Sequence, residues 1–526
     1  MIQKASRYLR TLRYLRLRQL LYRLWLPVKM FYARYRVPAW LKTEKKATTP
    51  ELKATPDSSV QYQDHLQFTF LNRSHDFKGK VDWNFSEFGK LWQYHLCYFD
   101  YLNQPGMNEV TGLDLMHQFI DALKEKKVKL EPYPLSLRCI NWIKFIVRHK
   151  INDPEVDQAL YAQFRFLRFT PEYHLMANHL LENQIALLWG AFYFRDKSWF
   201  DQLEPQLSSQ LKEQVLEDGA HFELAPMYHG IILQRLLDSV NLITHNADYS
   251  LQLEQLLQYQ AARMLGWLEQ NTFRNGDIPA VNDSSRDSTL STEVLKEYAA
   301  ALEIEPAESD SAQSGYHMIR QSDWELFVDT GNMNPDYNPG HSHCDALSFM
   351  LYHEQKPVIV DPGISTYEQS ERRLWERSTE AHNTVQPEGM EQAEIWGVFR
   401  VGRRYETRIT ESKENLLKAY HDGYRNRGIT HEREWRWDRH SIQITDRISG
   451  GEKLPVKAYL HFHPDCRVNL EGNTIAADNV MLKFTNFERI ELDSYQFCAG
   501  FNHLTEAYKA VVWFQSRLET QINTKS

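Results

Sequence analysis

The sequence predicts a chain of two main domains, an all-helical domain followed by an antiparallel β-sandwich. From about residue 108 to 303, apolar residues recur at helical spacing in segments separated by short polar breaks. After residue 315 the period changes to two, which is typical of strands with one buried face. Residues 303–315 have the proline, serine and acidic content of a linker. We therefore expect domains at residues 61–305 and 306–526.

The first 60 residues are predicted to be a basic helix followed by a linker. Arginine recurs among leucines and aromatic residues, and no apolar run there has the length of a signal peptide or a membrane-spanning helix. A basic helix of this composition suits the surface of an anionic membrane. A helix packed on the protein, with its arginines in solvent, is an equal alternative. Residues 40–60 are rich in Lys, Thr and Pro, as a linker is.

Eight helices are predicted in the helical domain from the apolar periodicity. Their steady spacing, with almost no strand-like alternation, favours consecutive helices packed as antiparallel pairs. We expect them at Leu113–Lys124, Leu135–His149, Glu155–Phe169, Asn178–Phe194, Trp199–Leu216, Tyr228–His245, Leu251–Glu269 and Ser291–Leu302.

Ten strands are predicted after the linker. So many short strands, with turn residues between them, favour a β-sandwich. We expect them at Tyr316–Arg320, Trp324–Thr330, Leu347–Tyr352, Val358–Val360, Tyr405–Thr410, Ile429–Trp437, Ser441–Ile448, Lys457–Phe462, Val480–Phe484 and Ala510–Phe514.

Composition excludes several classes of protein. A net charge of −8 means that the molecule as a whole does not attract nucleic acid or other polyanions, so an acidic polymer must be bound by local basic clusters. Five scattered cysteines without CxxC spacing argue against a disulfide framework and against a cysteine zinc cluster. No Walker or GxGxxG element precedes a helix, which argues against a nucleotide enzyme. Aromatic residues make up 13% of the chain and suit sugar rings, although most are expected in the core.

The segment from 340 to 367 carries the densest set of candidate functional residues. Alternation puts His341 and His343 on one side just before the first strand of a predicted hairpin, and Asp361 follows the second strand at the same end. Two imidazoles and a carboxylate at one rim suit a metal or a proton-transfer site. His382 follows soon after, and a His–Asp–His set suits zinc. The alternative is a polar hairpin end with surface histidines.

Two clusters in the helical domain also carry candidate residues. Asn178, His179 and Glu182 open a predicted helix, with His179 and Glu182 three residues apart on one face. Asn178 is equally well explained as the helix cap. Farther along, a loop containing glycine and proline leads to Tyr228 at the start of another helix, and a single Tyr-His pair is usually structural.

The motifs taken together resemble a known family. In chain order they are Asn-His-x-x-Glu at 178–182, Asp-Gly to Tyr-His at 218–229, His-x-His-x-Asp at 341–345 leading to Val-Asp-Pro-Gly at 360–363, and His-Asn-Thr-Val at 382–385. This series is similar to that of the heparinase II/III-like polysaccharide lyases and spans roughly residues 60–515. The resemblance implies an incomplete α/α toroid followed by an antiparallel β-sandwich. It also implies cleavage of uronic-acid polysaccharides by β-elimination.

The resemblance implies a role for each catalytic candidate. Tyr228 would protonate the leaving oxygen and, for some stereochemistries, also act as the base. His179 or His341 would be the alternative base. Asn178 and Glu182 would hold the uronate carboxylate, with Glu182 useful only if protonated, because two carboxylates otherwise repel each other.

The resemblance also implies a structural zinc site. The family's cation ligands carry over onto His343, Asp361 and His382. The metal would fix the sandwich loop that delivers His341 to a cleft formed mainly by the helical domain.

The sequence is also compatible with other functions and locations. A hydrolase on the same fold would use Glu182, Asp218 or Glu223 as its acid and base, and a catalytically silent carbohydrate-binding module is a third reading. The arginine-rich start differs from the secretory signal typical of the family. We therefore expect a bacterial enzyme of surface-polysaccharide metabolism, cytoplasmic or peripheral at the inner membrane, with a periplasmic location as the alternative. The oligomeric state cannot be inferred.

Overall fold

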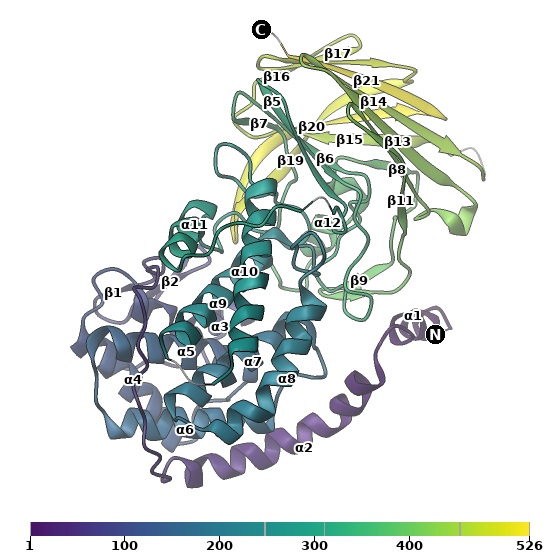
Figure 1. Cartoon of the computed structure of the whole chain (residues 1–526). Coiled ribbons are helices and arrows are strands. Elements are labelled where there is room, and N and C mark those ends of the chain that lie inside the picture. The colour runs from purple at the N-terminus through teal and green to yellow at the C-terminus, as the bar shows by residue number, and fades with distance from the viewer. Residues whose placement is uncertain (1, 247–248, 310, 452–453, 525–526) are drawn as a thin grey trace.

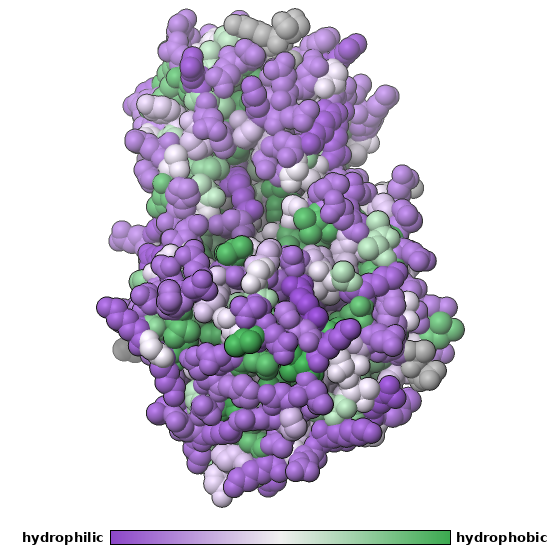
Figure 2. All heavy atoms as spheres, turned by 90° about the vertical axis from the view of Figure 1, so that its left-hand side faces the viewer, coloured by the Kyte–Doolittle hydropathy of each residue, from purple (hydrophilic) through white to green (hydrophobic). Residues whose placement is uncertain are grey.

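The computed structural model describes residues 2–246, 249–309, 311–451 and 454–524. Figure 1 shows the helical part below and most of the strands above, with an amino-terminal arm along the helical part. The last long helix of the helical part ends at Ala301 and the first strand of the upper part begins at Tyr316. The face on the left of Figure 1 is mostly hydrophilic, with apolar residues scattered among polar ones (Figure 2).

All eight predicted helices are present, with ends shifted by a few residues. Several begin where the sequence supplies a cap: Asp153 accepts hydrogen bonds from Glu155 N and Val156 N, and Pro154 occupies the first turn, where its missing N–H costs nothing. The eight are α4 (Glu109–Lys124), α5 (Pro132–His149), α6 (Pro154–Phe169), α7 (Ala177–Tyr193), α8 (Lys197–Gln214), α9 (Pro226–His245), α10 (Leu251–Asn271) and α11 (Thr292–Ala301). A further helix, α3 (Lys90–Tyr98), precedes them.

A small antiparallel sheet precedes these helices. Its strands are β1 (Tyr62–Gln63), β2 (Gln67–Phe70) and β3 (Arg73–Asp76). Phe68 and Phe70 are buried in the same core as the helices. This short sheet is therefore part of the helical domain.

The upper part is an antiparallel β-sandwich, as predicted. One sheet has the strand order β11-β12-β13-β14-β21-β18-β17-β16. Two smaller sheets have the strand orders β4-β5-β6-β7 and β19-β20-β15-β8. A β-bridge between Ile359 and Phe462 joins them. Trp324, Trp435 and Phe514 lie in the shared core. β5, which carries Trp324, is buried at every position, so it lies covered on both faces.

The strands include all ten predicted ones and several that the alternation did not reveal. In the first half they are β4 (Tyr316–Arg320), β5 (Trp324–Asp329), β6 (Phe349–His353), β7 (Lys356–Ile359), β8 (Val385–Pro387), β9 (Ile395–Gly397), β10 (Arg400–Val401), β11 (Thr407–Lys413) and β12 (Leu416–His421). The rest are β13 (Thr430–Trp437), β14 (Ser441–Ser449), β15 (Val456–His461), β16 (Val468–Glu471), β17 (Thr474–Ala477), β18 (Val480–Thr485), β19 (Arg489–Gly500), β20 (His503–Phe514) and β21 (Arg517–Thr524).

The amino-terminal arm consists of α1 (Ile2–Leu12) and α2 (Leu17–Trp40). Figure 1 shows α2 along the helical domain and α1 beside β9 of the upper part. Ala33, Val37 and Trp40 are buried in the core of the helical domain, which confirms the packed helix expected as one alternative. Within the described ranges, no helix is both long and apolar enough to span a membrane.

Candidate active site

The start of α7 carries two of the predicted site residues. His179 keeps part of its surface exposed, and its Nδ1 lies 3.3 Å from Glu172 Oε1. Burial lowers the pKa of His179, but nearby carboxylates, Glu172 first and then Glu223 and Glu182, outweigh burial and raise it overall. The Asn178 backbone N–H donates to Glu223 Oε1 at 3.1 Å. The Tyr133 ring lies 4.4 Å from that of His179 and adds an aromatic wall.

Tyr228 and His341 come from different domains, and their rings pack against each other at a tilt of 37°. Tyr228 lies in the first turn of α9, and its ring centroid is 4.3 Å from that of His341. Its hydroxyl is 3.2 Å from the hydroxyl of Tyr367. Burial raises the pKa of Tyr228, so the phenol keeps its proton at neutral pH. The sequence therefore brings a phenol and an imidazole together across the domain junction.

Asp283 holds His341 in place and was not singled out from the sequence. His341 Nδ1 lies 2.8 Å from Asp283 Oδ2, and Arg373 Nη1 lies 2.6 Å from Asp283 Oδ1. Burial opposes ionisation of Asp283, but Arg373 and the two histidines hold its pKa well below the usual range. An ionised Asp283 accepts the Nδ1–H of His341, which leaves Nε2 as an acceptor. His341 Nε2 lies 3.8 Å from Glu223 Oε2.

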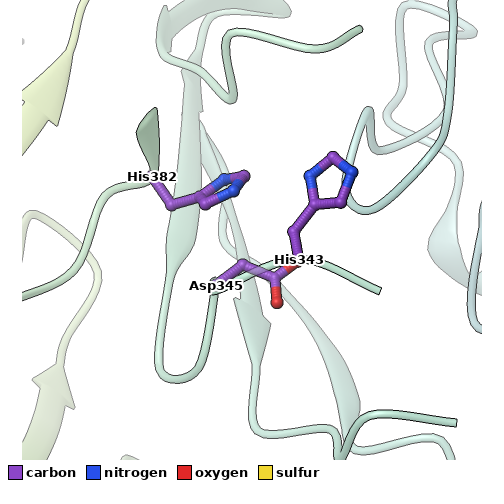
Figure 3. Close-up of side chains that lie close together, drawn as sticks. All are labelled: His343, Asp345 and His382. Atoms are coloured by element: carbon purple, nitrogen blue, oxygen red, sulfur yellow. The ribbon is translucent and has the colours of Figure 1, made fainter. Parts of the chain in front are cut away.

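Three buried side chains meet next to His341 in a group that could hold a metal ion. His343, Asp345 and His382 offer ligand atoms within 4.8 Å of one another, and the two imidazole rings lie 5.3 Å apart (Figure 3). Among the residues that the structure describes, His343 Nδ1, Asp345 Oδ2 and His382 Nε2 have no hydrogen-bond partner. Buried polar atoms rarely stay unpaired, so this group has the character of a ligand set.

Carboxylates orient both histidines of this group. His343 Nε2 lies 2.9 Å from Asp283 Oδ1, and His382 Nδ1 lies 2.7 Å from Asp361 Oδ2. Burial lowers the pKa of His343 to about 3, so its imidazole is neutral, as a metal ligand must be. A carboxylate behind each histidine is the usual support of a metal-bound imidazole.

The structure changes the ligand set expected from the sequence. Asp361 was expected beside His343 and His382, but its Oδ1 accepts the Gly363 N–H and its Oδ2 faces His382 Nδ1. Asp345 instead completes the group of three. Its position in the His-x-His-x-Asp motif was the available signal. Strand alternation did not reveal it, because residues 341–348 precede β6 and do not follow strand geometry.

Glu182 requires a correction. It was expected to hold the substrate carboxylate, but its side chain is fully buried and lies 3.4 Å from Arg235 Nε. Burial raises the pKa of Glu182, and Arg235 opposes that shift. Helix spacing placed His179 and Glu182 on one face, yet only His179 reaches solvent. Glu182 therefore belongs to a buried charge network and not to the ligand-facing surface.

The three carboxylates that a hydrolase could use, those of Glu182, Asp218 and Glu223, lie in different surroundings. Asp218 accepts hydrogen bonds from Ser314 N at 2.7 Å and Ala220 N at 3.2 Å, at the junction between the domains. Glu223 alone among Glu182, Asp218 and Glu223 contacts the histidine of the site. The arrangement therefore does not present two of these carboxylates across a shared opening, as an acid and base pair of a hydrolase requires.

Comparisons with solved structures show the same fold. A heparinase III structure aligns with a TM-score of 0.68 at 15% identity, covering 94% of this chain and 89% of that one. A second heparinase III, the BT4657 gene product, aligns with a TM-score of 0.63 at 16% identity, over 94% and 89% of the two chains. The heparan sulfate lyase HepC of Pedobacter heparinus aligns with a TM-score of 0.57 at 15% identity, over 94% and 88%. The architecture is therefore a helical toroid followed by an antiparallel sandwich.

Family models match both parts of the chain. The heparinase II/III N-terminus matches residues 136–311, and the heparinase II/III-like C-terminal domain matches residues 305–525. No sequence among the curated proteins matches this chain. Tyr228 lies in the part matched by the first model and His341 in the part matched by the second. Together the two models span residues 136–525, so the chain belongs to the heparinase II/III-like family of polysaccharide lyases.

Proposed function

We propose that the site at the domain junction cleaves a uronic-acid polysaccharide by β-elimination, with Tyr228 and His341 as the proton-transfer pair. The close contact of these two rings, with Asp283 fixing the imidazole, is the observation that carries the proposal. A protonated phenol and an acceptor nitrogen stand together at the domain junction, and both side chains are partly exposed. This is what a reaction that removes one proton and delivers another requires.

The chemistry assigns each group a task. A base takes the proton from C5 of the uronate, the C4–O bond breaks, and the leaving oxygen receives a proton, so that a C4=C5 double bond forms without consuming water. His341 Nε2 acts as the base, because its Nδ1–H is held by Asp283. Tyr228 acts as the acid, because burial keeps its phenol protonated. His179 was expected as an alternative base, but its raised pKa suits a cationic partner of the substrate carboxylate instead.

The substrate carboxylate must be neutralised for C5 to lose its proton. Asn178 and His179 at the start of α7 are the proposed partners of this carboxylate. The raised pKa of His179, which results from Glu172, favours the cationic imidazole. The helix start adds partial positive charge. Fixed donors aimed at the developing enolate are the type of stabilisation that lowers such barriers most.

A structural zinc ion is part of the proposal. His343, Asp345 and His382 would hold it, supported by Asp283 and Asp361. Two imidazoles and a carboxylate suit zinc, and the unpaired ligand atoms support this assignment. The ion would tie together the chain segments around residues 343 and 382. His341 lies two residues from one ligand, so the ion would stabilise its position.

The substrate class follows from the proposed chemistry. A uronate is required because only a carboxylate next to C5 makes the C5 proton removable. We also propose that the polymer belongs to bacterial surface-polysaccharide metabolism at the inner membrane, which the basic arm supports. The solved relatives include proteins named heparinase III and heparan sulfate lyase, which makes glycosaminoglycan-like polymers the first substrates to try.

The reaction class can be tested directly. The purified enzyme is incubated with a panel of sulfated and unsulfated uronate polymers, and ultraviolet absorbance and reducing ends are measured together. Elimination produces a 4,5-unsaturated end that absorbs in proportion to the number of bonds cleaved. Reducing ends that appear without this absorbance would mean hydrolysis and would overturn the proposal.

A further inference from the structure

One face of α2 is apolar and exposed along nearly the whole helix. Its apolar residues recur at alternating steps of four and three positions, which places them on a single line along the helix. Leu24 and Phe31 each keep 77% of their surface exposed. The members of this outward stripe are Leu17, Leu21, Leu24, Val28, Phe31 and Tyr35.

The opposite face of α2 is the docked one. Gln19, Ala33 and Val37 are buried, and Gln19 Nε2 donates to Leu175 O at 3.3 Å. At about 100° per residue these positions lie on the other side of the helix from Leu24 and Phe31. The outward stripe is therefore not a face that the arm uses to pack on its own domain. An exposed apolar strip of this length marks an interaction surface.

Basic side chains flank the stripe on both sides. Residues 1–43 contain eleven Lys and Arg and no acidic residue. α2 itself carries five cations, Arg18, Arg23, Lys29, Arg34 and Arg36. In the described part of the chain none of them forms an ion pair with a carboxylate, while Arg18 lies over the Tyr173 ring and Arg34 donates to Leu130 O.

We propose that the outward stripe of α2 lies in the surface of an anionic lipid bilayer, with the flanking cations at the level of the headgroups. Apolar residues that enter the interface and long basic side chains that reach phosphate are the two parts of an interfacial helix. Docking of α2 fixes which of its faces points outward, and the sequence alone did not reveal that. Membrane binding does not depend on the reaction proposed for the active site.

Charge argues against two other occupants of the stripe. A second copy of this chain would bring together two arms that carry only positive charge, without the acidic partners that helix pairs use at their flanks. A polyanionic sugar chain would neutralise the arginines but leave the apolar stripe in water. An anionic bilayer can bind both the apolar stripe and the flanking cations of α2.

The docked arm would also bring the active site close to the membrane. Leu175, which accepts from Gln19, lies in the loop that leads to α7. The guanidinium of Arg16 lies 4.0 Å from the ring centroid of Tyr337, in the segment that leads to His341. The arm therefore touches segments from both sides of the site. Membrane binding would place this site at the surface where a membrane-held polymer emerges.

The first test measures binding of the full-length protein to vesicles by co-sedimentation. One set contains phosphatidylcholine alone and the other contains phosphatidylcholine with phosphatidylglycerol. We expect binding to the anionic vesicles and at least about tenfold weaker binding to the neutral ones, because the flanking cations add favourable energy at an anionic leaflet. Binding should weaken as salt is raised, because charges are screened over about 8 to 10 Å at physiological ionic strength.

Paired substitutions test the stripe itself. The double variant Leu24→Glu with Phe31→Glu puts two carboxylates into the outward face, and we expect at least about tenfold weaker vesicle binding. Val110→Glu with Leu251→Glu is the matched control, because both residues are exposed apolar residues on other helices. The control should bind like the wild type. Thermal unfolding and activity on soluble polymer check that both variants are folded.

Each outcome is decisive for the proposal. Absence of binding to anionic vesicles, or equal binding of the stripe variant and the wild type, would overturn it. A concentration-dependent dimer that the stripe variant loses, without vesicle binding, would assign the stripe to a second copy. A wild type that binds vesicles but produces no unsaturated ends would count against the proposed reaction and leave the membrane inference intact.

Discussion

At the scale of single residues, few polar groups of the predicted site are also accessible to a substrate. Tyr228, His341 and His179 lie at the junction, whereas Glu182 from the same motif is buried against Arg235. A fully buried carboxylate that already faces a guanidinium does not bind a substrate without breaking a buried charge pair, which is costly. Position in a motif and role in a reaction are therefore separate properties.

Tyr228→Phe should abolish most of the turnover and spare binding. The change removes one hydroxyl and little volume, so we expect kcat to fall by ~10²–10⁴, the range for loss of a general acid or base. Steady-state kinetics with a uronate polymer measure kcat, and direct binding measures affinity. Tyr367→Phe is the matched control, because it removes only the hydroxyl that lies 3.2 Å from that of Tyr228. Unchanged turnover in Tyr228→Phe would exclude this residue from the chemistry.

Asp345→Asn should lower the zinc content of the purified protein. If His343, Asp345 and His382 hold the ion, loss of the carboxylate removes one ligand and reduces the affinity. Elemental analysis measures the metal, and thermal unfolding with and without a chelator measures its contribution to stability. Asp361→Asn is the comparison, because Asp361 faces His382 Nδ1 and acts through that ring. Metal content that falls only in Asp361→Asn would restore Asp361 as the direct ligand.

At the scale of elements, α1 is held on the upper part of the molecule by one carboxylate. Glu394 Oε2 accepts from Arg10 Nε at 2.8 Å, and Glu394 Oε1 lies 3.2 Å from Arg7 Nε. The Arg10 hydrogen bond is the main cause that lowers the pKa of Glu394 from 4.5 to about 2, against the effect of burial. The Tyr8 ring also packs edge-on against Trp396 at 4.8 Å.

Docking of α1 should depend on pH in a defined direction. Because the folded pKa of Glu394 is depressed, its contribution is present above the ordinary value of 4.5 and is lost as the pH falls toward about 2. Hydrogen exchange of residues 2–12, corrected for intrinsic rates, should show protection falling through this window. Glu394→Gln should show the lower protection already at neutral pH. Equal protection in both proteins would mean that the carboxylate does not hold the helix.

At the scale of the whole molecule, one face of the amino-terminal arm is buried in the core and the other is exposed. Val37 and Trp40 are buried at 5% and 6% exposure. Burying a large apolar side chain contributes roughly 1.5–3 kcal/mol. The arm connects to both domains, through α2 below and through Glu394 above.

Deleting residues 1–40 should therefore destabilise the protein. Loss of Val37 and Trp40 uncovers apolar surface on the helical domain, so we expect a clear drop in the thermal midpoint, measured by calorimetry. The Leu24→Glu, Phe31→Glu double variant should unfold near the wild-type temperature, because both side chains are exposed. A deletion that leaves the midpoint unchanged would mean that the packing of the arm adds nothing to stability.

The sequence by itself determined the elements and the order of the domains. The helical and alternating periods predicted all eight helices and all ten strands, because burial of one face imposes a pattern that local sequence carries. Strands without a clearly buried face carry no such pattern, and β19 was missed because most residues of its first half are polar. Family motifs led to Tyr228, His341 and the two histidines of the candidate metal group.

Tertiary structure alone decided which of these groups meet and which face outward. Asp283 is a single acid in a loop, and only folding places it between His341, His343 and Arg373. The exposure of His179 and the burial of Glu182 depend on neighbours far away in the chain. The arginines of α2 obscured a clean apolar face until docking showed which side is buried. Periodicity predicts that a helix or strand has an apolar face. Contacts between residues far apart in the sequence decide what covers that face.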